Sequence, residues 1–429
     1  MKILGITAEY NPFHNGHKYH LNESMRITGA DYSVAVMSGS FTQRGEPAVL
    51  DKWTRSRLAV QNGVDLVLEL PFLYACSRGE IFAAGAVDIL AGIGVTHISF
   101  GSESGNIGAL KDLVSGMNMH RGEIEKIRQQ KMREGDSFAR SQMHAVKNVL
   151  GAHSADLLSE PNNILAAEYL RRISYHNERG VHIIPCTVKR FGSGYASVSE
   201  KTGFAGASAL RKMTGEKASD ALAAGKSAGE KENGAAAGSA ECAAADFAHF
   251  MPADAAQALA SDGIRGLEKA KHNEFMLLQS ELMKVGSAEL SRIYCMGEGL
   301  ENKFRKEIVK AADMDEFISS MTSKRYTESA VRRIAAYVLM GIKTYEPERK
   351  PYARVLAAGR KGRELLRVIK KNDRTAIPVI TNLNKEWDNY ADIMGTLRYD
   401  LLAADLYNII HERSLYDFSD RVVRPYIEK

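Results

Sequence analysis

The sequence predicts an α/β fold, with a parallel β-sheet covered by helices at the N-terminus and a mainly helical, basic C-terminal region. Three observations lead to this class. Short apolar runs, typical of buried strands, alternate with helical stretches along roughly the first 200 residues, which implies βαβ units and a sheet covered on both faces. A helical pattern then dominates beyond residue 260. The length of 429 residues exceeds one ordinary core and favours about two or three domains.

Five apolar runs are expected to form the strands, namely Ile3–Ala8, Tyr32–Met37, Val64–Leu70, His97–Phe100 and His182–Val188. Helices are expected between them, for example over Gly16–Ile27, Trp53–Gln61 and Gly79–Ala91. Ligands of such sheets bind at the carboxyl ends of the strands, where the strand order reverses. The loops that carry Tyr10–His17, Ser38–Arg44 and Gly101–Glu103 are therefore expected to gather at one place.

Composition divides the chain into residues 1–213, 214–260 and 261–429. Ala and Gly dominate the middle part, which has few large apolar residues to bury, so a flexible or loosely helical low-complexity insertion is expected there. The last part begins with a strongly helical pattern over Gly266–Gly341. It then reads as a small α/β portion, with Tyr352–Ile369 helical, Ile377–Ile380 a strand, and further helices from about Ala391.

Composition also limits the class of protein. The residue content is that of a soluble globular protein, and no apolar run approaches the roughly 18 residues that would suggest a membrane span. The first apolar run is short and ends at Glu9, unlike a signal peptide. The four cysteines are scattered without metal-ligand spacing, which argues against structural zinc and fits a reducing compartment. A cytoplasmic protein without a membrane contact is expected.

Positive charge is concentrated in one segment. The whole chain has a net charge of +5, whereas Met321–Thr375 alone contains 15 Lys or Arg and 5 Asp or Glu, which gives 15 − 5 = +10. A surplus of this size attracts a polyanion. The alternative is a set of solvated helix faces without a partner.

The segment that carries chemistry lies directly after the first expected strand. Asn11-Pro12 is a turn signal, and His14 and His17 follow, three residues apart with Gly16 between them, at the start of a helix. A helix N-terminus with a nearby glycine is suited to phosphate, and two imidazoles can donate hydrogen bonds to its oxygens. Alternatively the histidines cap a turn or fill polar gaps. Zinc is disfavoured, because His20 would have only Glu9 as an acidic neighbour.

His14-Asn15-Gly16-His17 resembles the HxGH signature of the nucleotidyltransferase superfamily. The surrounding segments resemble the bacterial tRNA(Met) cytidine acetate ligase family over nearly the whole chain. These segments are GITAEYNPFHNGHKYHL, AVMSGSFTQRGEPAVLDKWTRSRLA, VDLVLELPFLYA, FGSES, PNNILAAEYLRR, VKRFGSGY, ASALRK and TSKRYTESAVRRIAAYVLMGI.

The resemblance implies a Rossmann-like, HUP-type nucleotidyltransferase domain over residues 1–213 and a tRNA-binding region over 261–429. It implies a ligase that activates acetate with ATP and Mg²⁺ to acetyl-adenylate, and then forms N4-acetylcytidine at the wobble position of elongator tRNA(Met). DNA is not an expected partner, and no protein metal site is expected. The alternatives are a small-molecule adenylyltransferase with the same HxGH loop and a non-catalytic RNA-binding protein that uses the fold as a scaffold.

The resemblance also implies site residues. His14 and His17 would be catalytic, and ATP would be bound by Thr7, Ala8, Glu9, Tyr10, Asn11, Pro12, Phe13, His14, Asn15, Gly16, His17, Lys18, Tyr19, His20, Gly101, Asn162 or Asn163, Lys189, Arg190, Ser208 and Arg211. Ser208 and Arg211 resemble the second signature of the superfamily, a loop on the pyrophosphate side. Read alone, they are an ordinary helix start with Ser as the N-cap.

The basic segment would bind tRNA through Lys324, Arg325, Arg332 and Arg333, with Tyr326 available for base stacking. Arg360, Lys361 and Arg363 are a second expected phosphate contact. The sequence departs from the family at Gly194–Ser197 and in the Ala-rich insertion, both close to the second signature.

A second glycine-containing loop, Ser38–Gly45, follows the second expected strand. It is either a wall of the acetate or nucleotide pocket, or a plain βα turn with Arg44 in solvent. Lys52, at the start of the next helix, is expected near the site.

Overall fold

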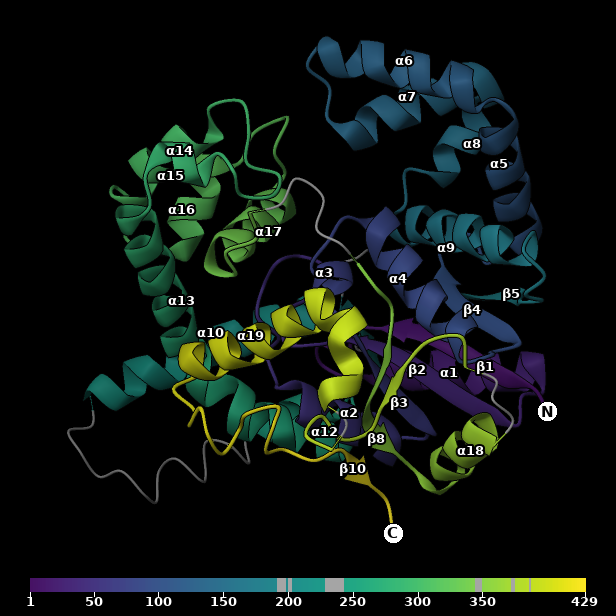
Figure 1. The fold of residues 1–429 in the computed structure, drawn as a ribbon. Coiled ribbons are helices and arrows are strands. Elements are labelled where there is room, and N and C mark those ends of the chain that lie inside the picture. Colours follow the sequence, from purple (N-terminus) through teal and green to yellow (C-terminus); the bar gives the residue numbers. More distant parts are fainter. Residues whose placement is uncertain (191–197, 200–202, 228–242, 344–348, 372–374, 386) are drawn as a thin grey trace.

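The computed structural model describes the chain except residues 191–197, 200–202, 228–242, 344–348, 372–374 and 386. A single large sheet runs through the molecule, with the strand order β10-β8-β3-β2-β1-β4-β5 and β9 beside β8 (Figure 1). A separate two-stranded ribbon, β6 (Val198–Ser199) and β7 (Phe204–Ala205), lies outside it.

The N-terminal strands confirm the predicted parallel sheet. They are β1 (Ile3–Ala8), β2 (Tyr32–Ser38), β3 (Leu66–Leu70), β4 (His97–Ser102) and β5 (Ile184–Lys189), and each neighbouring pair among them is parallel. Strand β1 has β2 on one side and β4 on the other. The strand order therefore reverses at β1, and the loops after β1, β2 and β4 meet at the carboxyl edge, as expected.

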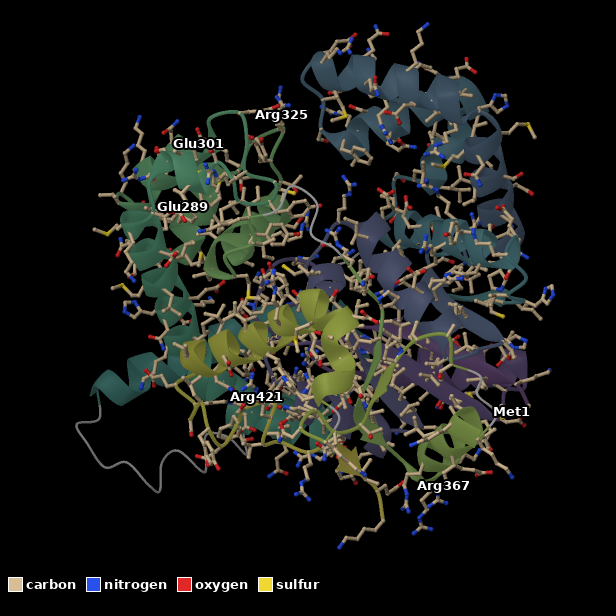
Figure 2. The ribbon with its side chains drawn as sticks, viewed as in Figure 1. Met1, Glu289, Glu301, Arg325, Arg367 and Arg421 are labelled. Carbon is tan, nitrogen blue, oxygen red and sulfur yellow. The ribbon has the colours of Figure 1, made fainter. Side chains whose placement is uncertain are left out.

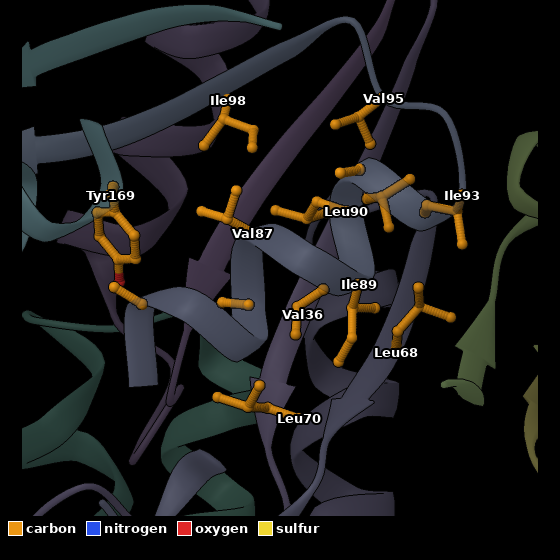
Figure 3. Packing of buried hydrophobic residues seen from close by; sticks show 14 of the residues in the cluster. Val36, Leu68, Leu70, Val87, Ile89, Leu90, Ile93, Val95, Ile98 and Tyr169 are labelled. Carbon is orange, nitrogen blue, oxygen red and sulfur yellow. The ribbon is translucent and has the colours of Figure 1, made fainter. Parts of the chain in front are cut away.

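Helices cover both faces of this sheet. On one face α4 (Gly79–Gly92) and α9 (Pro161–Asn177) bury the core shown in Figure 3, which includes Val36, Leu68, Leu90 and Tyr169. The opposite face packs against α1 (Asn15–Thr28) and α2 (Lys52–Gln61) through residues such as Leu4, Ile6 and Leu21. Helix α3 (Phe72–Ala75) follows β3 directly.

The C-terminal α/β portion is part of the same sheet, and the predicted helix over Tyr352–Ile369 is wrong for its first half. Residues Ala353–Ala358 form β8, antiparallel to β3 and buried at all six positions. Alanine and leucine favour helix locally, but pairing with β3 overrides that preference. Helix α18 (Arg360–Lys371) then packs tightly, since a Cβ on Gly362 would lie 1.9 Å from the Asp65 carbonyl oxygen. Strands β9 (Val379–Ile380) and β10 (Tyr426–Ile427) pair with β8.

Two helical units flank the sheet. The first, α5 (Ile107–Met119), α6 (Arg121–Arg133), α7 (Phe138–Leu150) and α8 (Ala152–Leu157), lies between β4 and α9 in sequence and has its own small core. The second confirms the helical pattern over Gly266–Gly341. It contains α13 (Ile264–Lys284), α14 (Ser287–Leu290), α15 (Leu300–Ile308), α16 (Met314–Met321) and α17 (Glu328–Leu339). Helix α19 (Met394–Ile410), preceded by the 3₁₀ segment Trp387–Ile393, packs on α13 and α3.

The described part of the Ala-rich insertion, predicted to be flexible or loosely helical, contains helices and buries some of its large side chains. Helix α10 spans Ala207–Ser227 and crosses the expected boundary at residue 213, and α12 (Ala253–Ala258) continues through a π-helical turn, Leu259–Gly263, into α13. Phe247, Phe250 and Met251 are buried with Leu50 and Leu58 of the N-terminal part. Three large side chains thus anchor an otherwise alanine-rich segment. Residues 228–242 are outside the described part of the chain.

Candidate functional site

The loop after β1 places both motif histidines at the start of α1. His14 is the N-cap residue, and its Nδ1 accepts a hydrogen bond from the Gly16 backbone N–H at 3.0 Å. His17 Nδ1 accepts from the His14 backbone N–H at 3.3 Å. Each ring therefore uses Nδ1 as an acceptor, which leaves the proton of the neutral imidazole on Nε2. Both Nε2–H groups are then donors for a ligand.

The two rings lie face to face, with centroids 3.7 Å apart and planes inclined by 27°, which confirms that the motif spacing brings them together. Burial, with the Arg190 and Arg211 guanidinium groups, lowers the pKa of His14 to about 3. Burial, His14 and Arg190 hold the pKa of His17 well below its usual value. Both histidines are therefore neutral at physiological pH and act as hydrogen-bond donors through Nε2 without carrying a charge.

Arg55 holds this loop in place, a role that the sequence does not indicate. Its fully buried guanidinium donates to the backbone oxygens of Leu50 (2.8 Å), Glu9 (2.7 Å), Ser38 (3.0 Å) and Gly39. One side chain thereby ties the end of β1 to the loop after β2. In a single sequence, no pattern distinguishes a buried arginine in the first turn of an expected helix from a surface arginine.

The insertion also supports the motif. The Asn15 backbone N–H donates to the Phe250 carbonyl at 2.9 Å, and its side-chain amide donates to the carbonyls of Gly203 (3.2 Å) and His249 (3.1 Å). The segment after the second signature is therefore in direct contact with the first turn of α1.

The second signature lies beside the first. Arg211 donates to the Asn11 carbonyl oxygen at 2.9 Å and to Ser208 Oγ at 3.2 Å. Its guanidinium lies close enough to lower the pKa of His14. Asn11 in turn accepts from the Val49 backbone N–H at 2.8 Å. The structure thus brings Ser208 and Arg211 to the HxGH loop, as predicted.

The loop after β4 brings a further group of predicted residues together. Arg190 donates to the Asn162 side-chain oxygen at 3.0 Å, and a Cβ on Gly101 would lie 3.4 Å from Arg190 Cγ. Asn162 is the partly exposed member of the asparagine pair, whereas Asn163 is buried and its side-chain oxygen accepts from the Ser104 backbone N–H. Glu103, which the sequence did not single out, accepts from the Asn162 side chain (2.5 Å) and from the Asn163 backbone N–H (2.9 Å).

The other residues predicted to bind ATP are either buried beneath the HxGH loop or partly to fully exposed around it. Ala8, Tyr10, Pro12 and Phe13 are buried under the loop, and the Tyr10 ring meets His17 edge-on at 5.0 Å between centroids. His20 Nε2 lies 3.4 Å from Ser99 Oγ. Thr7, Glu9 and Tyr19 are partly buried, while Lys18 and Lys189 are exposed. The stem of Lys189 packs on Gly105, where a Cβ would lie 2.6 Å from Lys189 Cβ. Residues Gly194–Ser197 all lie outside the described part of the chain.

The loop after β2 connects the motif to the helical unit. Its Gln43 backbone N–H donates to Glu9 Oε1 at 2.7 Å, and the Gln43 carbonyl accepts from Arg333 Nη1 at 3.0 Å. A Cβ on Gly45, which has φ +86°, would lie 2.3 Å from the Arg333 nitrogen. The loop is therefore packed against α17 and is more than a plain turn.

The four predicted tRNA-binding residues have different surroundings. Arg332 is ion-paired with Glu46 (3.3 Å), Asp315 (2.9 Å) and Glu328 (3.1 Å), and Arg333 holds Gln43. Lys324 and Arg325 are exposed, and Arg325 pairs with Glu298. Only Lys324 and Arg325 therefore face solvent.

Arg360, Lys361 and Arg363 lie at the opposite edge of the sheet from the motif. Lys361 donates to the Asp31 carbonyl just before β2, and Arg360 and Arg363 donate to carbonyls of Lys429 and Glu428. A phosphate bound by these three side chains would therefore lie far from the histidine pair.

Lys52 is not in the site. It is buried and ion-paired at 2.6 Å with both Glu69 and Asp420, which in turn pair with Arg354. The cluster joins the carboxyl end of β3 to the C-terminal segment of the chain.

A helix N-terminus, two stacked neutral imidazoles and two arginines thus surround one position at the switch point of the sheet. Such a position stabilises a phosphate group whose negative charge grows during displacement. Within the described ranges, no cluster of three or more metal-ligating side chains occurs, and no helix is long and apolar enough to span a membrane.

Fold and site define a nucleotidyl-transfer protein of the HIGH type, and residues 1–420 match the model of the HIGH nucleotidyl transferase family. The tRNA(Met) cytidine acetate ligase of Thermoanaerobacter sp. (strain X514) is 36% identical over 419 residues, which covers 96% of each chain. That of Bacillus subtilis (strain 168) is 33% identical over 395 residues, covering 90% of this chain and 88% of the relative. The chain therefore belongs to the family of tRNA(Met) cytidine acetate ligases.

Solved structures agree with this membership. The crystal structure of Thermotoga maritima TmcAL bound with alpha-thio ATP matches with a TM-score of 0.82 and 27% sequence identity, over 100% of both chains. The apo form of the same protein matches equally well.

Proposed function

We propose that this chain activates acetate with MgATP and transfers the acetyl group to the wobble cytidine of elongator tRNA(Met), forming N4-acetylcytidine. The observation that carries the proposal is the pair of stacked, neutral histidines beside Arg190 and Arg211. Curated relatives named tRNA(Met) cytidine acetate ligase, and a structural neighbour bound with alpha-thio ATP, support the choice of substrates.

In the first step an acetate oxygen attacks the α-phosphorus of ATP, and the bond to the β-phosphate oxygen breaks, so that pyrophosphate leaves with the electron pair. His14 and His17 donate Nε2–H bonds to phosphate oxygens, and Arg211 and Arg190 offset the charge of the leaving group. Because these groups are fixed before reaction by backbone hydrogen bonds, little reorganisation is needed.

In the second step the exocyclic amine of the cytidine attacks the acetyl carbonyl carbon of acetyl-adenylate. The carbon–oxygen bond to the phosphate breaks, AMP leaves, and the amine loses one proton. Asn162, held by Glu103 and Arg190, is the candidate contact for the nucleotide, and exposed Lys324 and Arg325 are the candidate contacts for RNA phosphates.

Isotope exchange between pyrophosphate and ATP tests the first step directly. Exchange should require acetate and should proceed without RNA. Exchange that is independent of acetate, but requires another small acceptor, would instead identify a small-molecule adenylyltransferase.

A further inference from the structure

A cavity of about 780 Å³ opens beside β8, which lies three strands from β1 in the sheet. It lies where β9 and β10 both border β8, between the segment after β9 and the C-terminal segment 420–427. Arg354 of β8 lies on the cavity floor and is paired across the sheet with Glu69 of β3. Glu69 is paired in turn with Met37 of β2, and Met37 is paired with Ala8 at the end of β1. Three strand spacings of about 4.8 Å therefore separate the cavity floor from the last residue of β1, roughly 14 Å along the same edge of the sheet.

The described lining of the cavity is cationic. Asp420 is the one carboxylate among the described lining residues, and it is neutralised within the buried cluster by Lys52 and Arg354, both 2.6 Å away. At the rim Lys385, Arg421 and Arg424 are exposed, and none of them is ion-paired within the part of the chain that the structure describes. Figure 2 labels Arg421, whose guanidinium lies 5.1 Å from the centroid of the Trp387 ring. An anion fits this rim better than a cation or a neutral ligand.

The walls offer hydrogen-bonding groups and an aromatic ring. Asn384 Nδ2 donates to the Arg421 carbonyl at 2.8 Å, and Asn382 Oδ1 accepts from the Asn384 backbone N–H at 3.0 Å. These bonds leave the Asn382 amide N–H₂ and the Asn384 amide oxygen without a partner among the described residues. An amide donor and an amide acceptor on two residues that line one cavity are groups that can hydrogen-bond to the edge of a nucleobase. The partly buried indole of Trp53 lines the same cavity.

We infer that this cavity binds one unstacked nucleotide of the RNA substrate, an inference that rests on the proposed function. Lys385, Arg421 and Arg424 hold its phosphate, while Trp53 and the Asn382–Asn384 pair contact its base. Since the cavity and the HxGH loop share one edge of the sheet, a bound nucleotide fixes the RNA while a nearby cytidine reaches the acetyl-adenylate. Reading an unpaired base here supplies selectivity that phosphate contacts alone do not give.

The test uses the full chain with Lys385→Gln and Arg424→Gln combined. The matched control combines Arg367→Gln and Lys370→Gln, two exposed residues of α18 that do not line the cavity. Arg367 is labelled in Figure 2. Acetate-dependent pyrophosphate exchange should be unchanged in both, because that step uses no RNA. The cavity variant should raise the KM for tRNA on the order of tenfold, with kcat within about twofold, and should lower the slope of log KM against log salt by about 1 to 2.

An equal KM for tRNA in the cavity variant and the control would overturn the inference. A wild-type protein that exchanges pyrophosphate but acetylates no tRNA would instead count against the proposed function.

In a Trp387→Phe background, Trp53 fluorescence should change on adding an anticodon-stem-loop RNA. Saturation by CMP or AMP with similar affinity would identify a free-nucleotide site and would also overturn the inference.

Discussion

At the scale of single residues, the chemistry depends on where His14 and His17 carry their protons. Both rings accept a backbone N–H at Nδ1 and lie in a buried, arginine-flanked position that keeps them neutral. The same hydrogen bonds form the N-terminal cap of α1. The cap and the candidate catalytic donors are thus one structure, and a substitution affects both.

Replacement of either histidine should therefore reduce the first step. We expect His14→Ala and His17→Ala each to lower acetate-dependent pyrophosphate exchange by about 10²–10³-fold, the usual loss for one donor at a developing oxyanion. His14→Ala should also cost about 1 kcal/mol of stability through the lost cap. His14→Asn restores a capping side chain, so recovered stability with activity still low would separate the two roles. Full exchange in His17→Ala would contradict the assignment.

The lowered pKa values also predict a pH dependence of stability. The pKa of His14 is about 3 in the fold, owing to burial and then to Arg190 and Arg211, against about 6.5 unfolded. The unfolded chain then binds more protons, so this stabilisation is complete above pH 6.5 and is lost as the pH falls toward 3. In urea denaturation, the free energy of unfolding should decrease as the pH is lowered from 7 to 5. The decrease should be smaller in a His14→Asn variant. Equal slopes in the two proteins would contradict this account.

At the scale of elements, the loop after β2 joins the motif to the helical unit. Glu9 holds Gln43, and Arg333 of α17 holds the same residue from the other side. Gly45 permits this contact for two reasons. Its φ is positive, and α17 packs so closely against it that a Cβ atom would not fit. The position of the loop beside the HxGH segment is therefore set partly by residues nearly 300 positions later in the chain.

Gly45→Ala tests this packing, and Gly180→Ala is its matched control. The two glycines have φ of +86° and +87°, but a Cβ would lie 2.3 Å from Arg333 N at Gly45 and would meet nothing within 4 Å at Gly180. Both variants should lose about 1 kcal/mol from backbone strain, and Gly45→Ala at least about 1–2 kcal/mol more from the clash. Urea denaturation measures both values, and equal losses would show that the contact with α17 is unimportant.

The sequence predicted most elements but not their long-range contacts. Strands β1 to β5 and the first helices followed from apolar runs and turn signals, because those signals are local. Strand β8 was missed since its Ala- and Leu-containing run becomes a strand only through pairing with β3. Arg55 and Glu103 are not predicted for the same reason, since Arg55 contacts the ends of other strands and Glu103 contacts the first turn of α9. His14, His17, Ser208 and Arg211 were brought together as the family resemblance implied.

At the scale of the whole molecule, the two ends of the chain form one folding unit. Strand β8 covers the edge of β3, and a buried cluster joins Lys52 and Glu69 to Arg354 and Asp420. Two cations and two carboxylates balance one another in this cluster, and each of the four side chains is less than 4% exposed. Residues 1–213 are therefore not expected to be stable alone, since they would expose the β3 edge and leave this cluster incomplete.

Asp420→Asn should accordingly destabilise the whole protein. Removal of one carboxylate leaves two buried cations with a single counter-ion, which typically costs about 3–5 kcal/mol. Asp417→Asn, three residues earlier and exposed, is the matched control and should be nearly neutral. Denaturant unfolding of both variants gives the difference, and a small effect of Asp420→Asn would show that the cluster does not hold the ends together.

The histidine pair is proposed to make acetyl-adenylate for the modification of tRNA(Met). The most direct measurement is mass spectrometry of nucleosides from purified tRNA(Met) after incubation with the protein, MgATP and isotope-labelled acetate. The wild-type chain should form labelled N4-acetylcytidine, and the variant that combines His14→Ala with His17→Ala should form it at least about a hundredfold more slowly. Labelled N4-acetylcytidine formed equally fast by that double variant, or none formed by the folded wild-type protein, would contradict this proposal.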